Sequence, residues 1–394
     1  MNTLPLAPEP EPHEAGYSRQ RAWVEVDAGA ITHNAATLVG ALAHGCSLMA
    51  VVKADGYGHG AVPVAEAALA GGASCFGVAT LAEGVQLRRA GMSAPILVLG
   101  NLIQAEELRS CLRWQLMPTL SGMREALLCQ NLAAAAGRPM LVHLKLDTGM
   151  ARLGIDWQEG ARLVAAIHEL ADVQLAGIYS HLACADAAPA DDDGLTTTQQ
   201  QRFETVLASL RQQQLASGCR HLANSAGTLR SRELHYDLVR VGLALYGHSP
   251  AQHLSASSAL RPAMQLRARV SLIREVGSGV GVSYGHRFRT SRPSRLAVVG
   301  IGYADGVPRQ LSGAISALHH GRAIPQVGAI TMDQLILDAT DCPELEVGSV
   351  VTLLGHDEGL SISPEDWSSR CGTIPWEILC GFKHRLPRLS LGAH

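Results

Sequence analysis

The 394-residue sequence is poor in aromatic residues (4%) and in charged residues (17%), and its charges nearly cancel, with 32 Lys and Arg against 35 Asp and Glu. This balance gives no broad positive surface for nucleic acid or for an anionic membrane. The sequence also lacks an apolar run of about 18 residues, the length that a membrane-spanning helix needs. We therefore expect neither a nucleic-acid partner nor a membrane. The low share of charge fits a face covered by a second subunit, or simply an alanine-rich composition.

The nine cysteines form no Cys-x-x-Cys pair, no disulfide framework and no spacing typical of metal ligands. Dispersed thiols in a long chain indicate a reducing compartment, and we expect no metal. The N-terminal residues include Glu9, Glu11 and Glu14 with four prolines, and they lack the basic start and apolar centre of a signal peptide. We interpret residues 1–18 as a disordered tail on a cytoplasmic protein.

Eight short apolar runs alternate with longer helix-forming stretches in the first two thirds of the chain. Continuous rather than alternating apolarity is typical of strands buried on both faces. Eight strand-then-helix units predict an α/β fold, a (β/α)8 TIM-type barrel over residues 19–255, with an open doubly wound sheet as the alternative. The runs are Leu48–Lys53, Cys75–Ala79, Ile96–Leu99, Leu116–Leu120, Met140–Leu146, Leu175–Tyr179, His221–Asn224 and Leu238–Leu245.

The pattern changes after Gly247. Short runs bounded by turn residues follow one another without a long helix between them, which predicts a mostly β domain over residues 256–394. A strand at Arg19–Asp27 precedes the first predicted helix, Ile31–Leu42, and we interpret it as isolated. The β runs are Gln265–Val276, Gly279–Tyr284, Arg295–Ile301, Ala323–Val327, Leu335–Asp338 and Val350–Leu354.

Polar residues stand where the predicted barrel strands end, which is where this fold places its active sites. Lys53 ends an apolar strand, so partial desolvation would lower its pKa and favour the nucleophilic amine, unless the side chain simply extends into solvent. Arg240 lies within an apolar strand and cannot lose its charge, so it needs an acceptor. Asn224 and Ser225 open a helix, where they could bind an anion or only cap the helix.

An imine-forming lysine, a partner for a ring nitrogen and an anion site are the parts that hold pyridoxal 5′-phosphate. A phosphosugar lyase with a Schiff-base lysine would use many of the same parts. The residues alone do not separate these two classes of enzyme.

Several motifs, taken in their order and spacing, distinguish between these two classes of enzyme. In these motifs the sequence resembles a bacterial alanine racemase, a pyridoxal-phosphate enzyme with a barrel and a β domain, and the resemblance covers about Trp23 to Pro387. The motifs are Val52-Lys53-Ala54-Asp55-Gly56-Tyr57-Gly58-His59-Gly60, Lys145 through Gly154, Ser180-His181, Asn224-Ser225, Val239-Arg240-Val241-Gly242, Val282-Ser283-Tyr284-Gly285, Gly302-Tyr303-Ala304-Asp305-Gly306 and Met332-Asp333-Gln334.

The resemblance implies a two-base racemisation of L- and D-alanine that provides D-alanine for peptidoglycan, in a homodimer with shared active sites. Lys53 would hold the cofactor and act as acid and base on the D-side, while Tyr284 from the partner subunit would act on the L-side. A phenol with its ordinary pKa of about 10 is a poor base at neutral pH. A nearby cation would lower that pKa, and the family pattern places His181 behind the phenol and Arg152 beside it.

The resemblance also implies the remaining contacts. Arg240, with His221 behind it, would face the pyridine nitrogen and leave it unprotonated, which favours return of a proton to the same carbon over transamination. Arg152 and the backbone of Met332 from the other subunit would receive the substrate carboxylate. The phosphate would be held by Tyr57, Ser225, Gly242 and Leu243, and the supporting residues would be Lys145 (carbamylated in some relatives), His181, Asn224, Tyr303 and Asp333.

One position departs from the family pattern. Trp376, which we keep among the cofactor-binding residues, stands where the family usually has a tyrosine whose hydroxyl reaches the phosphate and lines the substrate entrance. The indole has one N–H donor in a different place and more bulk, so the pocket shape and the preference for alanine are open. A racemase of serine or another small amino acid is therefore an alternative. A decarboxylase of the same plan is a weaker one, because such enzymes typically place a carboxylate, not an arginine, at the ring nitrogen.

Overall fold

The computed structural model describes residues 19, 21–188, 191, 194–257 and 259–391, which form two compact units. One unit is Ala28–Ala263, and the other combines Met264–Leu391 with the strand that ends at Asp27. The tail predicted at residues 1–18 lies outside the described residues. Within the described ranges, no helix combines the length and the apolar character that a membrane crossing needs.

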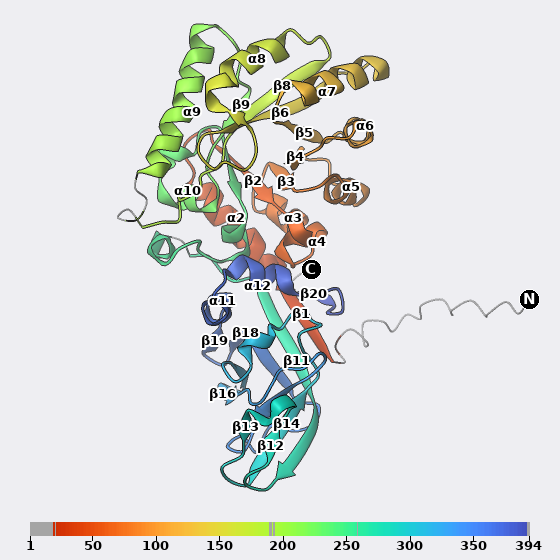
Figure 1. Ribbon diagram of the computed structural model, residues 1–394, viewed down its shortest axis with the longest axis vertical. Coiled ribbons are helices and arrows are strands. Elements are labelled where there is room, and N and C mark those ends of the chain that lie inside the picture. The colour runs from red at the N-terminus through yellow and green to blue at the C-terminus, as the bar shows by residue number, and fades with distance from the viewer. Residues whose placement is uncertain (1–18, 20, 189–190, 192–193, 258, 392–394) are drawn as a thin grey trace, which may run out of the picture. The chain divides into compact units, whose positions relative to one another are not determined.

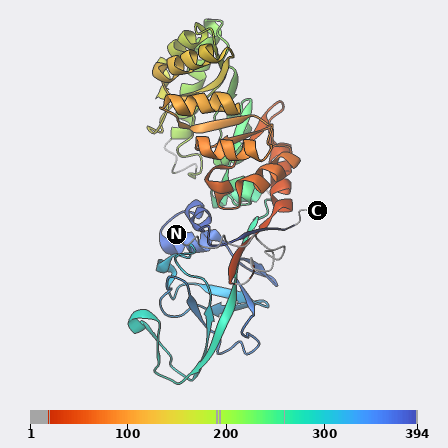
Figure 2. The ribbon, with the colours of Figure 1, turned by 90° about the vertical axis from the view of Figure 1, so that its right-hand side faces the viewer.

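The first unit is a parallel barrel of eight strands, which confirms the predicted fold class (Figures 1 and 2). β9 meets β10 through two backbone hydrogen bonds of 3.0 Å, from Asp237 N to Arg220 O and from Arg240 N to Ala223 O. All eight predicted runs overlap a strand. In spatial order the strands are β10 (Leu238–Val241), β2 (Ser47–Val51), β3 (Cys75–Val78), β4 (Ile96–Asn101), β5 (Met117–Leu120), β6 (Met140–Asp147), β8 (Val173–Tyr179) and β9 (Cys219–His221), with the short β7 (Ile155–Asp156) paired to β6.

The helices of the barrel unit lie outside its strands in both views. Their ends carry ordinary sequence signals: Thr80 and Glu83 form a capping box at the start of α5, and Gly137 ends α7 in the left-handed conformation. The helices are α2 (Ala28–Ala41), α3 (Lys53–Tyr57), α4 (Ala61–Ala70), α5 (Leu81–Arg89), α6 (Ala105–Trp114), α7 (Met123–Ala136), α8 (Gly160–His168), α9 (Leu195–Gln212) and α10 (Ser225–Arg230).

Apolar side chains fill part of the barrel interior. One cluster joins five different strands through Met49, Cys75, Leu97, Tyr179 and Leu238. Because helices cover the outside and such clusters fill the inside, the strands are buried on both faces, which explains their continuous apolar sequences.

The second unit is mostly β, as predicted. Its long strand β11 alternates buried and partly exposed residues over its first half, which is the pattern of a strand with one face on a core. The strands are β1 (Ala22–Asp27), β11 (Met264–Val276), β12 (Gly281–Val282), β13 (Phe288–Arg289), β14 (Ser294–Val299), β15 (Ser316–His319), β16 (Arg322–Pro325), β17 (Leu335–Asp338), β18 (Val350–Asp357), β19 (Leu360–Ile362) and β20 (Arg388–Leu391), with helices α11 (Pro364–Cys371) and α12 (Pro375–Gly381).

The strand predicted at Arg19–Asp27 is not isolated, and it does not belong to the barrel. β1 pairs antiparallel with β11, where Val24 lies opposite Leu266, and parallel with β20, where Val24 lies opposite Arg388. The interpretation was wrong because both partners are more than 200 residues away in the chain, and no local pattern reveals such a pairing. The barrel unit begins at Ala28 rather than at residue 19.

Candidate active site

Lys53 follows β2 after a single residue and starts a left-handed turn. The φ angles of Ala54, Asp55 and Gly56 are 53°, 53° and 60°, and that of Tyr57 is 54°. Each L-residue in this conformation costs roughly 1–2 kcal/mol, and runs of such residues are uncommon. Strain of this kind persists only where the surroundings fix it, and it concentrates at functional sites. The half-buried Lys53 is therefore followed by a backbone turn of unfavourable conformational energy, which the surrounding structure holds in place.

Arg240 of β10 lies inside the barrel, where it is only 3% exposed. Its guanidinium donates to the carbonyls of Ser180 (2.7 Å) and Leu222 (3.1 Å) and lies 3.1 and 3.2 Å from Nδ1 of His221 and His181. Burial lowers the pKa of Arg240 to about 10, so the group stays charged at neutral pH. All of these partners are neutral, and within the described contacts no carboxylate compensates the charge.

A buried chain of two imidazoles continues from Arg240. Because Arg240 donates to Nδ1 of His221, the remaining proton of His221 is on Nε2, which faces Nδ1 of His143 at 2.9 Å. Burial, with Arg240 as the second cause, lowers the pKa of His143 to about 4 and that of His221 well below its usual range, so both rings are neutral. Gly177 makes room, since a Cβ there would lie 2.7 Å from the His143 ring. Sequence analysis missed His143; its only signal is the i, i+2 spacing to Lys145, which places both on one face of the strand.

His181 is also neutral. Burial, followed by the positive charges of Arg240, Lys145, Arg152 and Lys53, lowers its pKa well below the ordinary value. Of the two groups that the family pattern places near a phenol, only Arg152 therefore carries a positive charge. Lys53, Lys145, Arg152 and Arg240 therefore all act on the same imidazole.

Lys145 is 6% exposed and lies among positive charges. Burial and then the repulsion of Arg240, Arg152 and Lys53 lower its pKa to about 8, while Asp147 acts in the opposite direction. Oδ1 of Asp147 accepts three backbone amides, at 2.9 to 3.1 Å, from the loop that leads to Arg152. An excess of cations at this end of the barrel suits an anionic ligand.

A buried glutamine joins two loops of the site. Gln199 of α9 donates from Nε2 to Oγ1 of Thr148 (3.2 Å) and to the carbonyl of His181 (2.9 Å). It therefore ties the loop after β6 to the loop after β8. Gln199 was not predicted, because nothing in the run Gln199–Gln201 tells which of three glutamines faces inward.

Hydroxyl groups and a glycine form a cradle between β9 and β10. Asn224 caps α10 by accepting from Gly227 N at 3.0 Å, so capping is what it does here. Ser225 Oγ accepts from the backbone amide of Gly242 at 3.0 Å. A Cβ at Gly242 would lie 2.4 Å from Oη of Tyr57, so only glycine fits this close approach. The hydroxyls of Tyr57 and Ser225, at the close approach to the Gly242 backbone and next to the buried Leu243, fit a phosphate group.

The other predicted residues lie in the second unit, around one loop. Ala329 accepts a hydrogen bond from Ser283 (2.7 Å), beside Tyr284, and the carbonyl of Met332 accepts one from Ala304 (3.0 Å), beside Tyr303. Tyr284 is 73% exposed and Met332 is 52% exposed. Large exposed side chains of this kind, here on neighbouring loops of one unit, are typical of an interaction surface.

The buried carboxylate of Asp305, which belongs to one of the sequence motifs but had no role assigned to it, fixes this region. Asp305 accepts hydrogen bonds of 2.6 and 2.7 Å from Arg21 and one of 3.0 Å from Gly302 N, next to Tyr303. Arg385 lies 3.6 Å from Asp305 and donates to the predicted Asp333 at 2.7 Å. Asp333 therefore belongs to a charge network of the second unit.

Trp376 stands in the first turn of α12, where its side chain is partly exposed. An indole has no hydroxyl, so Trp376 cannot provide the hydroxyl contact of the tyrosine that the family pattern has at this position.

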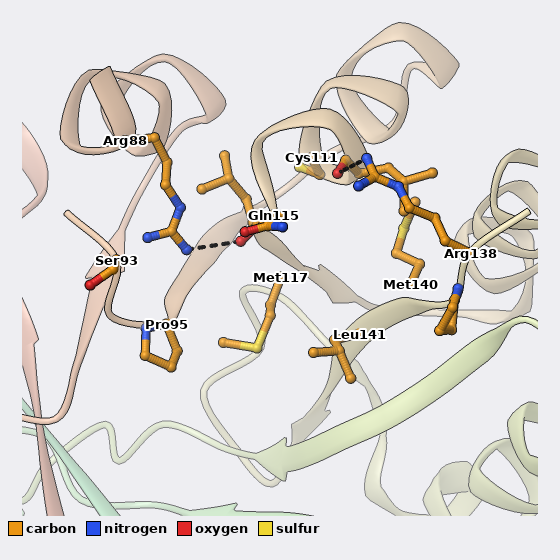
Figure 3. A pocket seen from close by; sticks show the side chains of 12 residues that line it. Arg88, Ser93, Pro95, Cys111, Gln115, Met117, Arg138, Met140 and Leu141 are labelled. Atoms are coloured by element: carbon orange, nitrogen blue, oxygen red, sulfur yellow. Dashed lines mark hydrogen bonds between the residues drawn. The ribbon is translucent and has the colours of Figure 1, made fainter. Parts of the chain in front are cut away.

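A cavity of about 370 Å³ lies at the opposite end of the barrel, at the amino ends of β4, β5 and β6 (Figure 3). Arg88 lines one side of it and donates to the carbonyls of Trp114 (3.0 Å), Met92 (2.6 Å), Ala94 (2.7 Å) and Gln115 (2.9 Å). None of the predicted site residues lines this cavity. Arg88 and Arg138, which donates to the carbonyl of Leu112 at 2.5 Å, are both occupied in joining segments of this end, which fits its structural role in such barrels.

Comparison with known proteins agrees with this geometry. Residues 26–250 match the family model for the alanine racemase N-terminal domain, and residues 263–390 match that for the alanine racemase C-terminal domain. The chain belongs to the alanine racemase family. The alanine racemase of Prochlorococcus marinus is 57% identical over 376 residues, 95% of this chain and 97% of the relative, and that of Nostoc is 49% identical over 374 residues, 94% and 96%.

Solved alanine racemase structures show the same fold. The enzyme from Streptomyces lavendulae superimposes with a TM-score of 0.89 at 38% identity, covering 95% of this chain and 98% of that one. The enzyme from Bacillus anthracis, solved with bound L-Ala-P, superimposes with a TM-score of 0.87 at 34% identity, covering 95% and 96%. The resemblance stated from the sequence motifs is thereby confirmed. The match extends over both units, which favours a racemase over a decarboxylase of the same plan.

Proposed function

We propose that this chain interconverts L-alanine and D-alanine with pyridoxal 5′-phosphate bound at Lys53. The observation that carries the proposal is the combination, at one end of the barrel, of Lys53 with a charged Arg240 that lacks a carboxylate partner among its described contacts. Pyridoxal phosphate, when bound, makes the Cα proton of an amino acid acidic. Tyr57, Ser225 and Gly242 would hold its phosphate.

Two groups of the chain would move the proton. Lys53 Nζ would serve one face of the substrate, and the phenol of Tyr284 from a partner subunit would serve the other. Two bases are needed because a single base tends to return a proton to the face from which it came. Arg152, with the backbone of Met332, would bind the substrate carboxylate. The 73% exposure of Tyr284 supports a surface that a second subunit covers.

Arg240 would donate to the ring nitrogen of the cofactor. Since its pKa of about 10 keeps its own protons in place at neutral pH, it leaves that nitrogen unprotonated. The neutral His221 and His143 behind Arg240 add no second charge. This arrangement supports proton return to Cα over transamination and disfavours the decarboxylase alternative. Tyr303 and Trp376 would shape the entrance, where a preference for serine or another small amino acid would arise.

We place the enzyme in the cytoplasm, with D-alanine for peptidoglycan as its product. No disulfide joins any two of the nine cysteines, all of which lie in the described part of the chain. Burial raises the pKa of Cys111 and Cys129 to about 12, so these thiols are unreactive. A reducing compartment suits such a chain.

The chain offers a sharp test because it contains only three lysines, Lys53, Lys145 and Lys383. Borohydride treatment of the cofactor-loaded protein should fix the cofactor on Lys53, and peptide mass spectrometry should find the adduct there. The adduct should disappear in Lys53→Ala and persist in the control Lys383→Ala. An adduct that persists in Lys53→Ala would refute the assignment.

Substrate choice is tested by incubating the loaded enzyme with a panel of L-amino acids in heavy water. Alanine should incorporate deuterium at Cα and racemise fastest, with serine slower. Turnover of serine above that of alanine would overturn the alanine assignment, and release of carbon dioxide would show a decarboxylase.

A further inference from the structure

One carboxylate connects the turn after Lys53 with a helix of the neighbouring βα unit. Oε2 of Glu83 accepts hydrogen bonds from the amides of Ala79 (2.7 Å) and Thr80 (3.1 Å), at the start of α5. Oε1 accepts a hydrogen bond of 2.8 Å from the amide of Ala54. Glu83 therefore bridges the loops that follow β3 and β2.

The contact to Ala54 is additional to what helix capping requires. The described part of the chain holds two other capping boxes, Gln104 with Glu107 in α6 and Ser363 with Asp366 in α11. Within the described contacts, Glu107 accepts only the amide of Gln104, at 3.2 Å. One carboxylate oxygen is thus enough for a cap, and the second oxygen of Glu83 is available for the turn.

The contact falls at a decisive point of the backbone. Ala54 is the residue directly after Lys53 and the first with left-handed φ and ψ, 53° and 47°. Further along the turn, the amide of Gly56 donates to Val52 O at 2.9 Å. On the other side of Lys53, the amide of Val52 is held by Gly77 O of β3, also at 2.9 Å. Lys53 is therefore bracketed by Gly77 before it and by Glu83 after it.

We propose that Glu83 is a positioning residue that directs Lys53 toward the cofactor by fixing the amide of Ala54. A left-handed residue has several alternative conformations of lower energy, so release of this amide would let the turn relax and rotate the Cα–Cβ bond of Lys53. A charge-assisted hydrogen bond is suited to oppose that relaxation. The inference rests on the proposed function, because the orientation of Lys53 matters only if Lys53 holds the cofactor.

The test uses a shortened side chain. Asp366 shows that an aspartate suffices for a capping box in this chain, because its Oδ2 accepts the amide of Ser363 at 2.7 Å. Glu83→Asp should therefore keep the cap of α5 while its carboxylate no longer reaches Ala54. Glu107→Asp is the matched control, with the same shortening at a residue that only caps. Glu83→Gln is a second variant. It keeps the length of the side chain, but only its oxygen can accept hydrogen bonds, because its nitrogen is a donor.

The first measurement is hydrogen exchange of the protein without cofactor, followed by mass spectrometry of a peptide containing residues 52–60. Loss of a hydrogen bond to a charged group corresponds to roughly a tenfold or larger change in an opening equilibrium. We expect exchange at the Ala54 amide to accelerate by about that factor in both Glu83 variants. Exchange should be unchanged in Glu107→Asp.

The second measurement is titration of the same proteins with pyridoxal 5′-phosphate, followed by the absorbance of the covalent cofactor. Both Glu83 variants should bind it about tenfold more weakly or worse, and Glu107→Asp as tightly as the wild type. Unchanged exchange and affinity in both Glu83 variants would overturn the proposal, as would equal changes in Glu107→Asp. A wild-type protein that forms no adduct at Lys53 would refute the proposed function instead, while the exchange data would still decide whether Glu83 fixes the turn.

Discussion

Lys145 shows how the surroundings of a single residue set its chemistry. The amine is nearly enclosed, and its pKa of about 8 results from burial and from the neighbouring cations, with Arg240 first among them. Above pH 8 most of it is neutral, and a neutral amine attacks carbon dioxide. A carbamate would replace a positive charge by a negative one among Arg240, Arg152 and Lys53, which favours the product.

We therefore predict that Lys145 carries a carbamate. In buffer with ¹³C-bicarbonate at pH 9, the wild type should give a carbamate carbon signal, which should weaken toward pH 7 as the amine becomes protonated. Lys145→Met should lack the signal and Lys383→Met should keep it. A signal that survives in Lys145→Met, or none at pH 9, would contradict the prediction.

At the scale of elements, the two ends of the barrel strands have different tasks. The carboxyl ends carry Lys53 and Arg240, whereas the amino ends of β4, β5 and β6 surround the cavity that Arg88 lines. Four carbonyls depend on this arginine, and each loses a partner if the guanidinium is removed. Arg89, the next residue in α5, is exposed and contacts the Trp114 ring at 5.6 Å.

Arg88→Met should lower the free energy of unfolding by roughly 2–4 kcal/mol, measured by urea denaturation. Arg89→Met should change it by less than about 1 kcal/mol. The cofactor affinity of both variants should equal that of the wild type, because the cavity lies at the other end of the strands. A loss of cofactor affinity in Arg88→Met without loss of stability would refute this division of tasks.

The elements also show where sequence patterns suffice. The eight barrel strands were predictable because burial on both faces makes their sequences mostly apolar, with a few polar side chains such as Lys145 and Arg240 as exceptions. The prediction that the strand at Arg19–Asp27 is isolated was wrong. In the β unit, β13, β15, β19 and β20 were not predicted, because short strands are defined by the partners they pair with rather than by their own composition.

At the scale of the whole molecule, the predicted site residues divide between two units. Lys53 belongs to the barrel unit, and Tyr284 belongs to the β unit. If Tyr284 serves the site of a partner, subunits with different defects should complement one another. A dimer of Lys53→Ala with Tyr284→Phe contains one site with both natural residues, because each defect lies in the other site.

Equal mixing of the two variants with subunit exchange should therefore restore about a quarter of the wild-type activity, since about half of the dimers are mixed and one site in each is intact. Each variant alone should stay inactive, which is the control. Native mass spectrometry should verify the mixed dimers. Mixed dimers without activity would contradict shared sites.

The sequence by itself determined the barrel, the β domain and the motif residues. Apolar runs and short motifs lie within a few consecutive residues, so they can be recognised without knowledge of distant contacts. Only the tertiary structure decided the pKa shifts of His181 and Lys145 and the hydrogen bonds that lead from Arg240 through His221 to His143. It also decided the hydrogen bond between Glu83 and the amide of Ala54, in the turn after Lys53. These properties depend on burial and on charges from segments far apart in the chain. Coulombic and desolvation energies depend on distance in space, which the order of residues does not contain.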